Sequence, residues 1–241
     1  MRLDRLIGGR APYTRKQIHA LVKAGRVEVN RKLARDAAMA IDPALDSVSL
    51  DGRLLGAARF RHAMMHKPAG VLTASRDRRS PTVMGLIPAE SRFAMQPVGR
   101  LDKDVTGLLL LTEDGELLHR LISPRYGVEK QYEARVAGRL DERDVTAFAH
   151  GIALNDFEAL PATLDVLEYG TESLARLTIT EGKYHQVKRM FAARGKPVLT
   201  LRRVAFAGVA LDETLEAGQF RHLTDDEAER LYRAARLVTP R

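Results

Sequence analysis

The stretch PVGRLDKDVTGLLLLTEDGELLHRLISP, residues 97–124, contains the clearest structural signal in the chain. Its centre is a run of four leucines, residues 108–111, which predicts a strand buried on both of its faces. The Glu-Asp-Gly sequence at 113–115 predicts a turn, and the residues after it predict a helix. The stretch therefore indicates a strand, a turn and a helix that belong to the core of a folded domain.

An irregular loop precedes this strand, between Gly99 and Gly107, and it carries four charged side chains: Arg100, Asp102, Lys103 and Asp104. Glycines let the backbone approach a ligand closely, and charged groups on such a loop can point into a cleft. Asp102 is therefore a candidate catalytic residue. The alternative is that it only caps a turn, and its spacing alone does not decide between the two.

A second segment, ITEGKYHQVKRMFAARGKPV at residues 179–198, combines the end of a strand, a Glu-Gly turn and a helix closed by Gly195. One face of this helix is apolar, with Val187, Met190 and Phe191. The opposite face is polar, with His185, Lys188 and Arg189 at spacings of three and four residues. The helix can therefore pack on a core and present a basic side to an anionic substrate, although three polar residues on a surface helix are also ordinary.

A third segment, VEKQYEARV at residues 128–136, alternates as a strand does. Tyr132 shares one face of this strand with Lys130 and Ala134. A buried tyrosine is usually structural, so Tyr132 taken alone does not indicate a function.

The composition indicates a globular protein. The chain has 241 residues, of which 45% are hydrophobic, so it can bury a core. It has no cysteine, which excludes disulfides and thiolate metal sites. The sequence MRLDRLIGGR lacks the apolar stretch of a secretory signal, and the runs GLLLL and VAFAGVAL are too short to span a bilayer. We therefore expect a cytoplasmic protein that has no membrane contact.

The charge is distributed unevenly. The formal net charge is +8, and residues 1–62 hold 13 Lys/Arg against 6 Asp/Glu, whereas the other residues hold 26 against 25. A solvated surface is one explanation, but such an imbalance favours a polyanionic partner, and nucleic acid before a membrane. A second basic cluster is predicted from seven residues: Lys183, Lys188, Arg189, Arg194, Lys196, Arg202 and Arg203.

Residues 1–58 have the pattern of two helices followed by short strands. Apolar residues at helical spacing mark the helices: Leu3, Leu6 and Ile7, then Ile18, Leu21 and Val22. Thr14 and Gln17 predict a capping box for the second helix, Gly25 suits the left-handed position that ends it, and residues 51–52 predict a turn. This unit offers a basic surface rather than a deep pocket, with six candidate RNA-binding residues: Arg2, Arg5, Arg15, Lys16, Lys23 and Arg26.

Three sequences in this region, RLDRLI, TRKQIHALVKAGRVEVN and LDSVSLDG, resemble an S4 RNA-binding domain over about residues 1–58. Arg31 and Lys32 stand where that family usually has a turn glycine, so we expect the hairpin there to differ. Residues 59–63 would be a linker, and residues 64–241 a larger domain. The fold class expected is α+β, with the larger domain built on a mainly antiparallel or mixed β-sheet.

Five further stretches, taken in order, resemble the RsuA family of pseudouridine synthases: HKPAGVLTASRD, GRLDKDVTGLLLLT, EKQYEARV, EGKYHQVKRM and LRRVAFAGVAL. With the S4-like region, this resemblance covers essentially the whole chain. It implies an isomerase that flips a uridine out of ribosomal RNA, breaks the C1′–N1 bond and reconnects the uracil through C5. No atoms are gained, so the resemblance implies neither a cofactor nor a metal, and the sequence has no Walker loop or dinucleotide fingerprint.

Within that family, EGKYHQVKRM looks closest to the enzyme of the small ribosomal subunit. The large-subunit relatives more often carry arginine where this chain has Lys188. The expected partner is therefore 16S ribosomal RNA, alone or in an assembling ribosomal particle, and we expect a monomer.

The resemblance also assigns roles to individual residues. Asp102 would be the catalytic carboxylate, either as a nucleophile at C1′ or as a base at C2′. Lys188 would be the first candidate for the cation that keeps it ionised, and Arg189 the second. Tyr132 would be catalytic and would stack on the uracil. The expected substrate-binding residues are Arg100 (as a wedge or phosphate contact), Arg189, Leu201 (as an apolar floor), Lys130 and His185.

Three alternatives remain. The first is a large-subunit (23S) enzyme of the same family. The second is a non-catalytic S4-type RNA-binding or ribosome-assembly factor, which gives Asp102 and Tyr132 no reason to occupy their motifs. The third is a glycoside hydrolase that pairs Asp102 with Asp104 or Asp114. The basic surface, the absence of tryptophan and the 5% aromatic content argue against sugar subsites.

Overall fold

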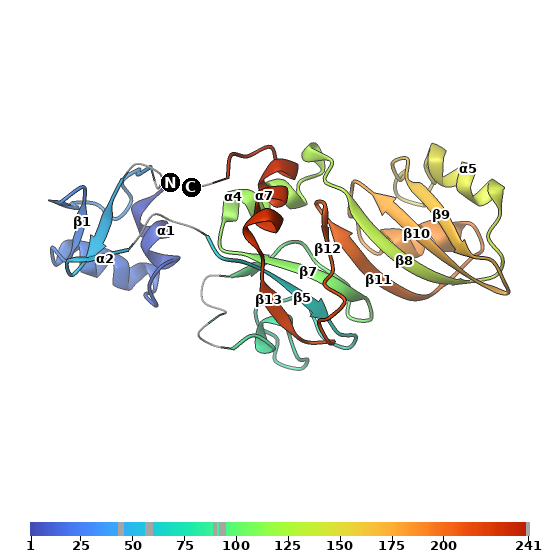
Figure 1. Cartoon of the computed structure of the whole chain (residues 1–241), viewed down its shortest axis with the longest axis horizontal. Coiled ribbons are helices and arrows are strands. Elements are labelled where there is room, and N and C mark those ends of the chain that lie inside the picture. The colour runs from blue at the N-terminus through green and yellow to red at the C-terminus, as the bar shows by residue number, and fades with distance from the viewer. Residues whose placement is uncertain (43–45, 56–59, 89–90, 92–94, 240–241) are drawn as a thin grey trace.

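Two β-sheets organise the chain, a small one near its N-terminus and a large one after it (Figure 1). Within the residues that the structure describes, the small sheet has four strands and the large sheet nine. Neighbouring strands pair mainly antiparallel and helices pack against them, so the protein is α+β, as expected. The structure is a computed structural model, and it describes residues 1–42, 46–55, 60–88, 91 and 95–239.

The small sheet and two helices share one core near the N-terminus. The elements are α1 (Leu3–Gly8), α2 (Arg15–Lys23), β1 (Val27–Val29), β2 (Lys32–Leu33), β3 (Val48–Leu50) and β4 (Arg53–Leu54). The strands lie in the antiparallel order β2-β1-β3-β4. Thr14 caps α2 through the predicted capping box with Gln17, and Gly25 has the predicted left-handed backbone, with φ +69°.

The turn between β1 and β2 forms without glycine. Asn30 and Arg31 both have left-handed backbones, with φ of 52° and 63°, which few non-glycine residues adopt. The Asn30 side chain supports this turn, because its Oδ1 accepts a hydrogen bond from the Ser47 amide at 2.8 Å and its Nδ2 donates to Asp46 at 2.7 Å. The sequence predicted that this hairpin would differ from the S4 pattern, which has a glycine in the turn. In this chain the Asn30 side chain stabilises the turn instead.

The large sheet lies in the order β13-β5-β7-β11-β8-β10-β9, with β12 beside β11 and β6 beside β7. Its strands are β5 (His62–Lys67), β6 (Gln96–Pro97), β7 (Thr106–Thr112), β8 (Lys130–Ala137), β9 (Thr163–Glu168), β10 (Glu172–Ile179), β11 (Val198–Phe206), β12 (Val209–Ala210) and β13 (Phe220–His222). β5 already covers His62 and Ala63, which the sequence had suggested as linker, and Arg59 lies outside the described residues.

A parallel contact between β7 and β11 joins the two halves of the large sheet. At its centre, Gly107 has a φ of +100°, and a Cβ there would collide with the backbone of Arg203. Only glycine fits this conformation and this close approach without moving β11. Because β7 begins here, the loop before it reaches the middle of the sheet.

The leucine run of β7 is buried on both faces, as predicted. Leu108 and Leu110 face a core that also holds residues of α4 (Gly115–Ile122) and α7 (Asp225–Ala234). Leu109 and Leu111 face a second core that holds residues of α6 (Gln186–Ala193). Successive side chains of a strand point to opposite faces, so a run of leucines suits a strand covered on both sides.

Helix α5 (Glu142–His150) packs on β9 at the far end of the large sheet (Figure 1). Its apolar face is narrow: Phe148 is buried and Val145 half-buried, but Ala149 is exposed. Short 3₁₀ segments follow β5 and α4, at η1 (Val83–Gly85) and η2 (Pro124–Tyr126). No helix in the described part of the chain is long and apolar enough to cross a membrane.

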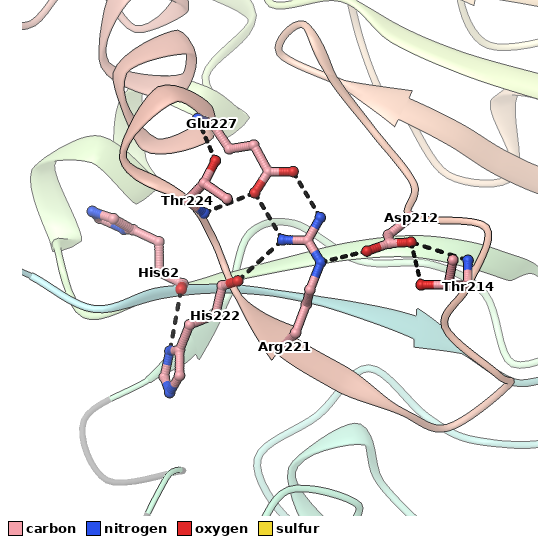
Figure 2. A network of polar contacts seen from close by, with 7 residues as sticks. All are labelled: His62, Asp212, Thr214, Arg221, His222, Thr224 and Glu227. Atoms are coloured by element: carbon pink, nitrogen blue, oxygen red, sulfur yellow. Dashed lines mark hydrogen bonds and ion pairs between the residues drawn. The ribbon is translucent and has the colours of Figure 1, made fainter.

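Arg221 on β13 anchors α7 to the large sheet, as Figure 2 shows. Its guanidinium donates to both carboxylate oxygens of Glu227 at 2.8 Å and to Asp212 at 2.6 Å. Glu227 also belongs to the capping box in which Thr224 caps α7. These contacts hold the start of α7 against the large sheet.

A buried polar cluster lies where α4, α7 and β5 meet. Asp114 caps α4 by accepting a hydrogen bond from the Glu116 amide at 2.8 Å, and it accepts another from the Tyr232 hydroxyl at 3.0 Å. His62 lies edge-on to the Tyr232 ring, and its Nδ1 is 2.8 Å from Thr112 Oγ1. Burial lowers the pKa of His62 to about 4, although the charge of Asp114 opposes this shift.

This buried histidine predicts acid-sensitive stability. The unfolded chain protonates His62 near its ordinary pKa of 6.5, whereas the folded protein does so only near 4, so its stabilising contribution is present above pH 6.5 and is lost as the pH falls toward 4. The free energy of unfolding should fall between pH 7 and pH 4.5 in both proteins. We expect this fall to be about 2 to 3 kcal/mol smaller for His62→Gln than for the wild type. Urea denaturation at both pH values measures this, and His119→Gln, at an exposed histidine, should behave as the wild type does.

Candidate active site

The loop before β7 forms one wall of a cavity at the centre of the large sheet. The other walls come from β8, the end of β10, β11 and the start of α6. The cavity holds about 440 Å³ of empty space and opens to solvent. Six of the residues suggested by the sequence line it: Arg100, Asp102, Tyr132, His185, Lys188 and Leu201.

Two basic side chains flank the Asp102 carboxylate. Lys188 Nζ lies 3.4 Å and His185 Nε2 lies 3.6 Å from the same oxygen, Oδ2. The Asp102 side chain is 31% exposed, so it can reach a ligand in the cavity while it stays beside the Lys188 ammonium. A nearby cation favours the ionised form of a carboxylate.

Lys188 also binds a second carboxylate of the loop. Its Nζ donates to both oxygens of Asp104, at 2.7 and 2.8 Å, and this hydrogen-bonded pair lowers the pKa of Asp104. The ammonium therefore bridges Asp102 and Asp104, and its closest contact is with the more exposed Asp104. The sequence had suggested Lys188 as a partner of Asp102 but not as this bridge.

Tyr132 and Leu201 supply the apolar part of the cavity. Tyr132 comes from the middle of β8, where it lies opposite Leu177 of β10 and Arg203 of β11. Leu201 comes from β11, and both side chains are nearly buried. An aromatic and an aliphatic wall opposite a carboxylate suit a planar, mostly apolar group such as a nucleobase.

Two of the suggested residues lie outside the cavity lining. Arg189 forms an ion pair with Asp156, so it is not the second cation beside Asp102. Lys130 is buried behind Gly182, and its Nζ donates to the Val128 carbonyl at 2.9 Å. Burial lowers the pKa of Lys130 to about 8. Asp156 is distant in sequence from the motif that suggested a role for Arg189, whereas Val128 lies only two residues before Lys130.

The second basic cluster is largely neutralised or buried. Arg194 pairs with Asp144 at 3.0 Å, and Arg202 pairs with Glu213 at 2.5 Å. Arg203 is only 2% exposed, and its Nε donates to a backbone carbonyl of β7. The second basic cluster expected from the sequence is therefore partly matched by carboxylates from other segments.

The six basic residues suggested in the N-terminal region differ in whether they form ion pairs with carboxylates. Arg2 and Arg15 both pair with the buried Asp4, at 2.7 and 3.0 Å. Arg26 pairs with Asp51, and Arg5 lies against Gly115 at the start of α4. The two remaining side chains are exposed and form no ion pair with any described residue: Lys16 and Lys23.

Sequence reasoning missed a buried lysine below the loop. Lys67, at the end of β5, is fully buried, and its Nζ donates to the carbonyls of Pro68 at 3.0 Å, Lys103 at 3.3 Å and Val105 at 2.8 Å. Burial lowers its pKa to about 8, against the opposing pull of the loop carboxylates. A lysine that ends an otherwise apolar strand was the available signal.

The segment after Lys67 also holds the loop. The amide of Gly70 donates to the Lys103 carbonyl at 2.8 Å. The hydroxyl of Thr73 accepts from the Leu101 amide at 3.1 Å and donates to the Leu101 carbonyl at 2.9 Å. The backbone on both sides of Asp102 is thus fixed by contacts from a single segment, which holds the carboxylate in place before a ligand arrives.

The cavity has the parts needed for reaction at a nucleoside. It offers a carboxylate beside the Lys188 ammonium, an aromatic wall and an exposed arginine, Arg100. Such a carboxylate can act as a nucleophile or as a base. Among the described residues, no group of three or more His, Asp or Glu side chains could hold a metal ion.

Comparison with known proteins gives a consistent result. Residues 61–193 match the sequence pattern of a family described as RNA pseudouridylate synthase. The chain is 40% identical to the uncharacterized RNA pseudouridine synthase YtzG of Bacillus subtilis, over 94% of this chain and 96% of that protein. It is 37% identical to ribosomal small subunit pseudouridine synthase A of Escherichia coli, over 94% of this chain and 98% of that protein.

A solved structure shares the fold. The crystal structure of a pseudouridylate synthase matches with a TM-score of 0.68 at 35% identity, over 96% of this chain and 99% of that chain. The family pattern covers more than half of the sequence and includes Asp102, Tyr132 and Lys188. The resemblance noted in the sequence is therefore confirmed, and the protein belongs to the RNA pseudouridylate synthase family.

Proposed function

We propose that this protein isomerises one uridine of small-subunit (16S) ribosomal RNA to pseudouridine. The observation that carries the proposal is the Asp102 carboxylate, which lies between Lys188 and His185 and shares one cavity with Tyr132. Relatives named for the small ribosomal subunit, from Escherichia coli and Vibrio cholerae, support the choice of RNA. Their similarity spans both the N-terminal region and the larger sheet, which favours a shared substrate over a large-subunit target.

The proposed reaction needs one carboxylate and no co-reactant. The C1′–N1 bond of the uridine breaks, the uracil turns within the cavity, and a bond forms between C1′ and C5. The hydrogen on C5 leaves as a proton, and N1 gains one, so the atoms balance. Asp102 acts as a nucleophile at C1′ or as a base at C2′, and both roles require it to be ionised.

The surrounding residues then have defined roles. Lys188 and, when protonated, His185 stabilise the negative charge of Asp102. Tyr132 stacks on the flipped uracil, which offsets part of the free energy needed to remove a base from its stack. Leu201 is the apolar floor, and Arg100 contacts a phosphate or takes the place of the flipped base. Arg189 and Lys130 have no direct contact with the uridine in this scheme.

The N-terminal region is the proposed RNA-docking unit. We assign residues 1–58 to an S4-like RNA-binding domain, 59–63 to a linker and 64–241 to the catalytic domain, with β5 reaching two residues into the linker. The exposed Lys16 and Lys23 would contact phosphates, whereas Arg2, Arg15 and Arg26 would have to exchange a carboxylate partner to do so. We further propose that the protein acts as a monomer in the cytoplasm.

Asp102→Asn tests the catalytic assignment. We expect it to slow pseudouridine formation by at least about 1,000-fold, because an amide is neither a base nor a nucleophile of comparable strength. Pseudouridine can be mapped in transcribed 16S RNA by carbodiimide labelling and primer extension. Asp104→Asn is the matched control, and it should cost less than about tenfold because Lys188 keeps Asp102 as a partner. Equal losses in both variants would contradict a single catalytic carboxylate.

Lys67→Met tests the support of the loop. Its removal takes the buried donor away from the carbonyls of Pro68 and Val105, so we expect the free energy of unfolding to fall by about 2 to 3 kcal/mol. The displaced loop should lower kcat more than it raises KM. Lys103→Met removes an exposed lysine of the same loop, and its stability should stay within about 0.5 kcal/mol of the wild type.

The double variant Lys16→Ala and Lys23→Ala tests the docking surface. If both ammonium groups contact phosphates, the slope of log affinity for 16S RNA against log salt should become shallower by about 1.5. Filter binding over a potassium chloride series measures this slope. Arg125→Ala with Arg230→Ala removes the same charge from η2 and α7 and should leave the slope nearly unchanged. Equal slopes for the wild type and the lysine variant would exclude this surface.

A further inference from the structure

An exposed aromatic side chain stands at the rim of the active-site cavity. Tyr184 is 75% exposed, although Lys183 before it and His185 after it both line the cavity. Tyr184 itself is outside the lining, so it is placed to meet what lies next to the cavity rather than what enters it. A single exposed tyrosine is ordinary, but this one is held in place by its neighbours.

The ring of Tyr184 is stacked on the ring of His185. The ring centroids are 3.8 Å apart and the planes differ by 18°. One face of the tyrosine is therefore covered, and the exposed fraction places the other face in solvent. A flat ring with one free face is the kind of surface on which a nucleobase stacks.

The backbone fixes this pair of rings relative to the catalytic carboxylate. His185 caps α6 with a left-handed backbone, φ 50° and ψ 28°, which is uncommon for a residue other than glycine. Its Nε2 lies 3.6 Å from Asp102 Oδ2, and its carbonyl accepts a hydrogen bond from the Arg189 amide at 3.0 Å. Uncommon backbone conformations of this kind occur at functional sites, where surrounding contacts maintain them.

The chemistry of the rim favours RNA over a protein partner. The nearby aromatic ring of Phe157 is covered by cations, with Lys183 Nζ 3.7 Å and Arg189 Cζ 5.0 Å from its centroid. Tyr184 has one free ring face and lies beside Lys183 and Arg189, whose guanidinium donates to the Tyr184 carbonyl at 3.5 Å. Cations interleaved with a free aromatic face suit a strand of bases and phosphates.

We propose that Tyr184, supported by His185, stacks on the base of the nucleotide adjacent to the isomerised uridine. The inference rests on the proposed function, in which the uridine leaves its stack and enters the cavity. That movement uncovers a face of each neighbouring base, and an aromatic ring at the rim can cover one of them. Tyr184 would thereby help to hold the flipped state.

Turnover of 16S RNA by variants at position 184 tests this role. We expect Tyr184→Ala to lower kcat/KM by about 10- to 100-fold, the size of one lost base–aromatic stack, while Tyr184→Phe stays within about twofold of the wild type. Tyr169→Ala is the matched control, because Tyr169 is 58% exposed on the turn between β9 and β10, away from the cavity lining. It should behave as the wild type does.

A modified RNA separates stacking from a structural effect. The same RNA is made with an abasic residue on the 5′ or the 3′ side of the target uridine. One of these two abasic RNAs lacks the base that stacks on Tyr184. On that RNA, kcat/KM of the wild type should fall about as much as Tyr184→Ala lowers it on intact RNA. The Tyr184→Ala substitution should then cause little further loss on the same abasic RNA. If Tyr184→Ala matches the wild type on intact RNA, or if its loss is equally large on both abasic RNAs, the stacking role is wrong. A wild type that forms no pseudouridine in 16S RNA overturns the proposed function, and this inference with it.

Discussion

The close approach of Gly107 to Arg203 is the constraint on which the rest of the structure depends. It joins the two halves of the large sheet in parallel at the start of β7, where a side chain would collide with β11. The loop that carries Asp102 therefore ends in the interior of the sheet rather than at its edge. Leu201 on β11 and Tyr132 on β8, the next strand, come within reach of this loop as a consequence.

The sequence predicted the features that local chemistry determines. The leucine run, the turn and helix after it at residues 113–122, the cap at Thr14 and the apolar face of α6 follow from spacing over a few residues, and the structure shows each of them. Resemblance, rather than spacing, brought Asp102, Tyr132 and Lys188 together, and the cavity places all three in its lining. The misses were partners distant in sequence: Asp156 beside Arg189, Asp104 beneath Lys188, and the carbonyls around Lys67. Such pairs depend on the tertiary fold, which local patterns do not contain.

Three buried cations surround the active site without a carboxylate partner among the described residues: Lys67, Lys130 and Arg203. Backbone carbonyls accept their hydrogen bonds, and Lys130 and Arg203 also lie over the ring of Phe206, 5.0 and 4.9 Å from its centroid. Carbonyl dipoles do not cancel a full charge, so the interior below the cavity is electropositive. This field attracts a phosphate backbone, whereas many arginines at the surface are matched by acids.

The leucine run of β7 has a further consequence for how the chain finds its fold. Leucine is accepted on both faces of this strand, so shifting it by one residue would leave the burial of apolar groups almost unchanged. The four leucines supply cohesion but little information about alignment. The register must therefore be set at the two ends of the strand. At one end Gly107 lies against the backbone of Arg203, and at the other Thr112 Oγ1 lies within hydrogen-bond distance of His62 Nδ1. Substitutions at Gly107 or Thr112 would permit misaligned states of this strand, whereas substitutions among the leucines would not.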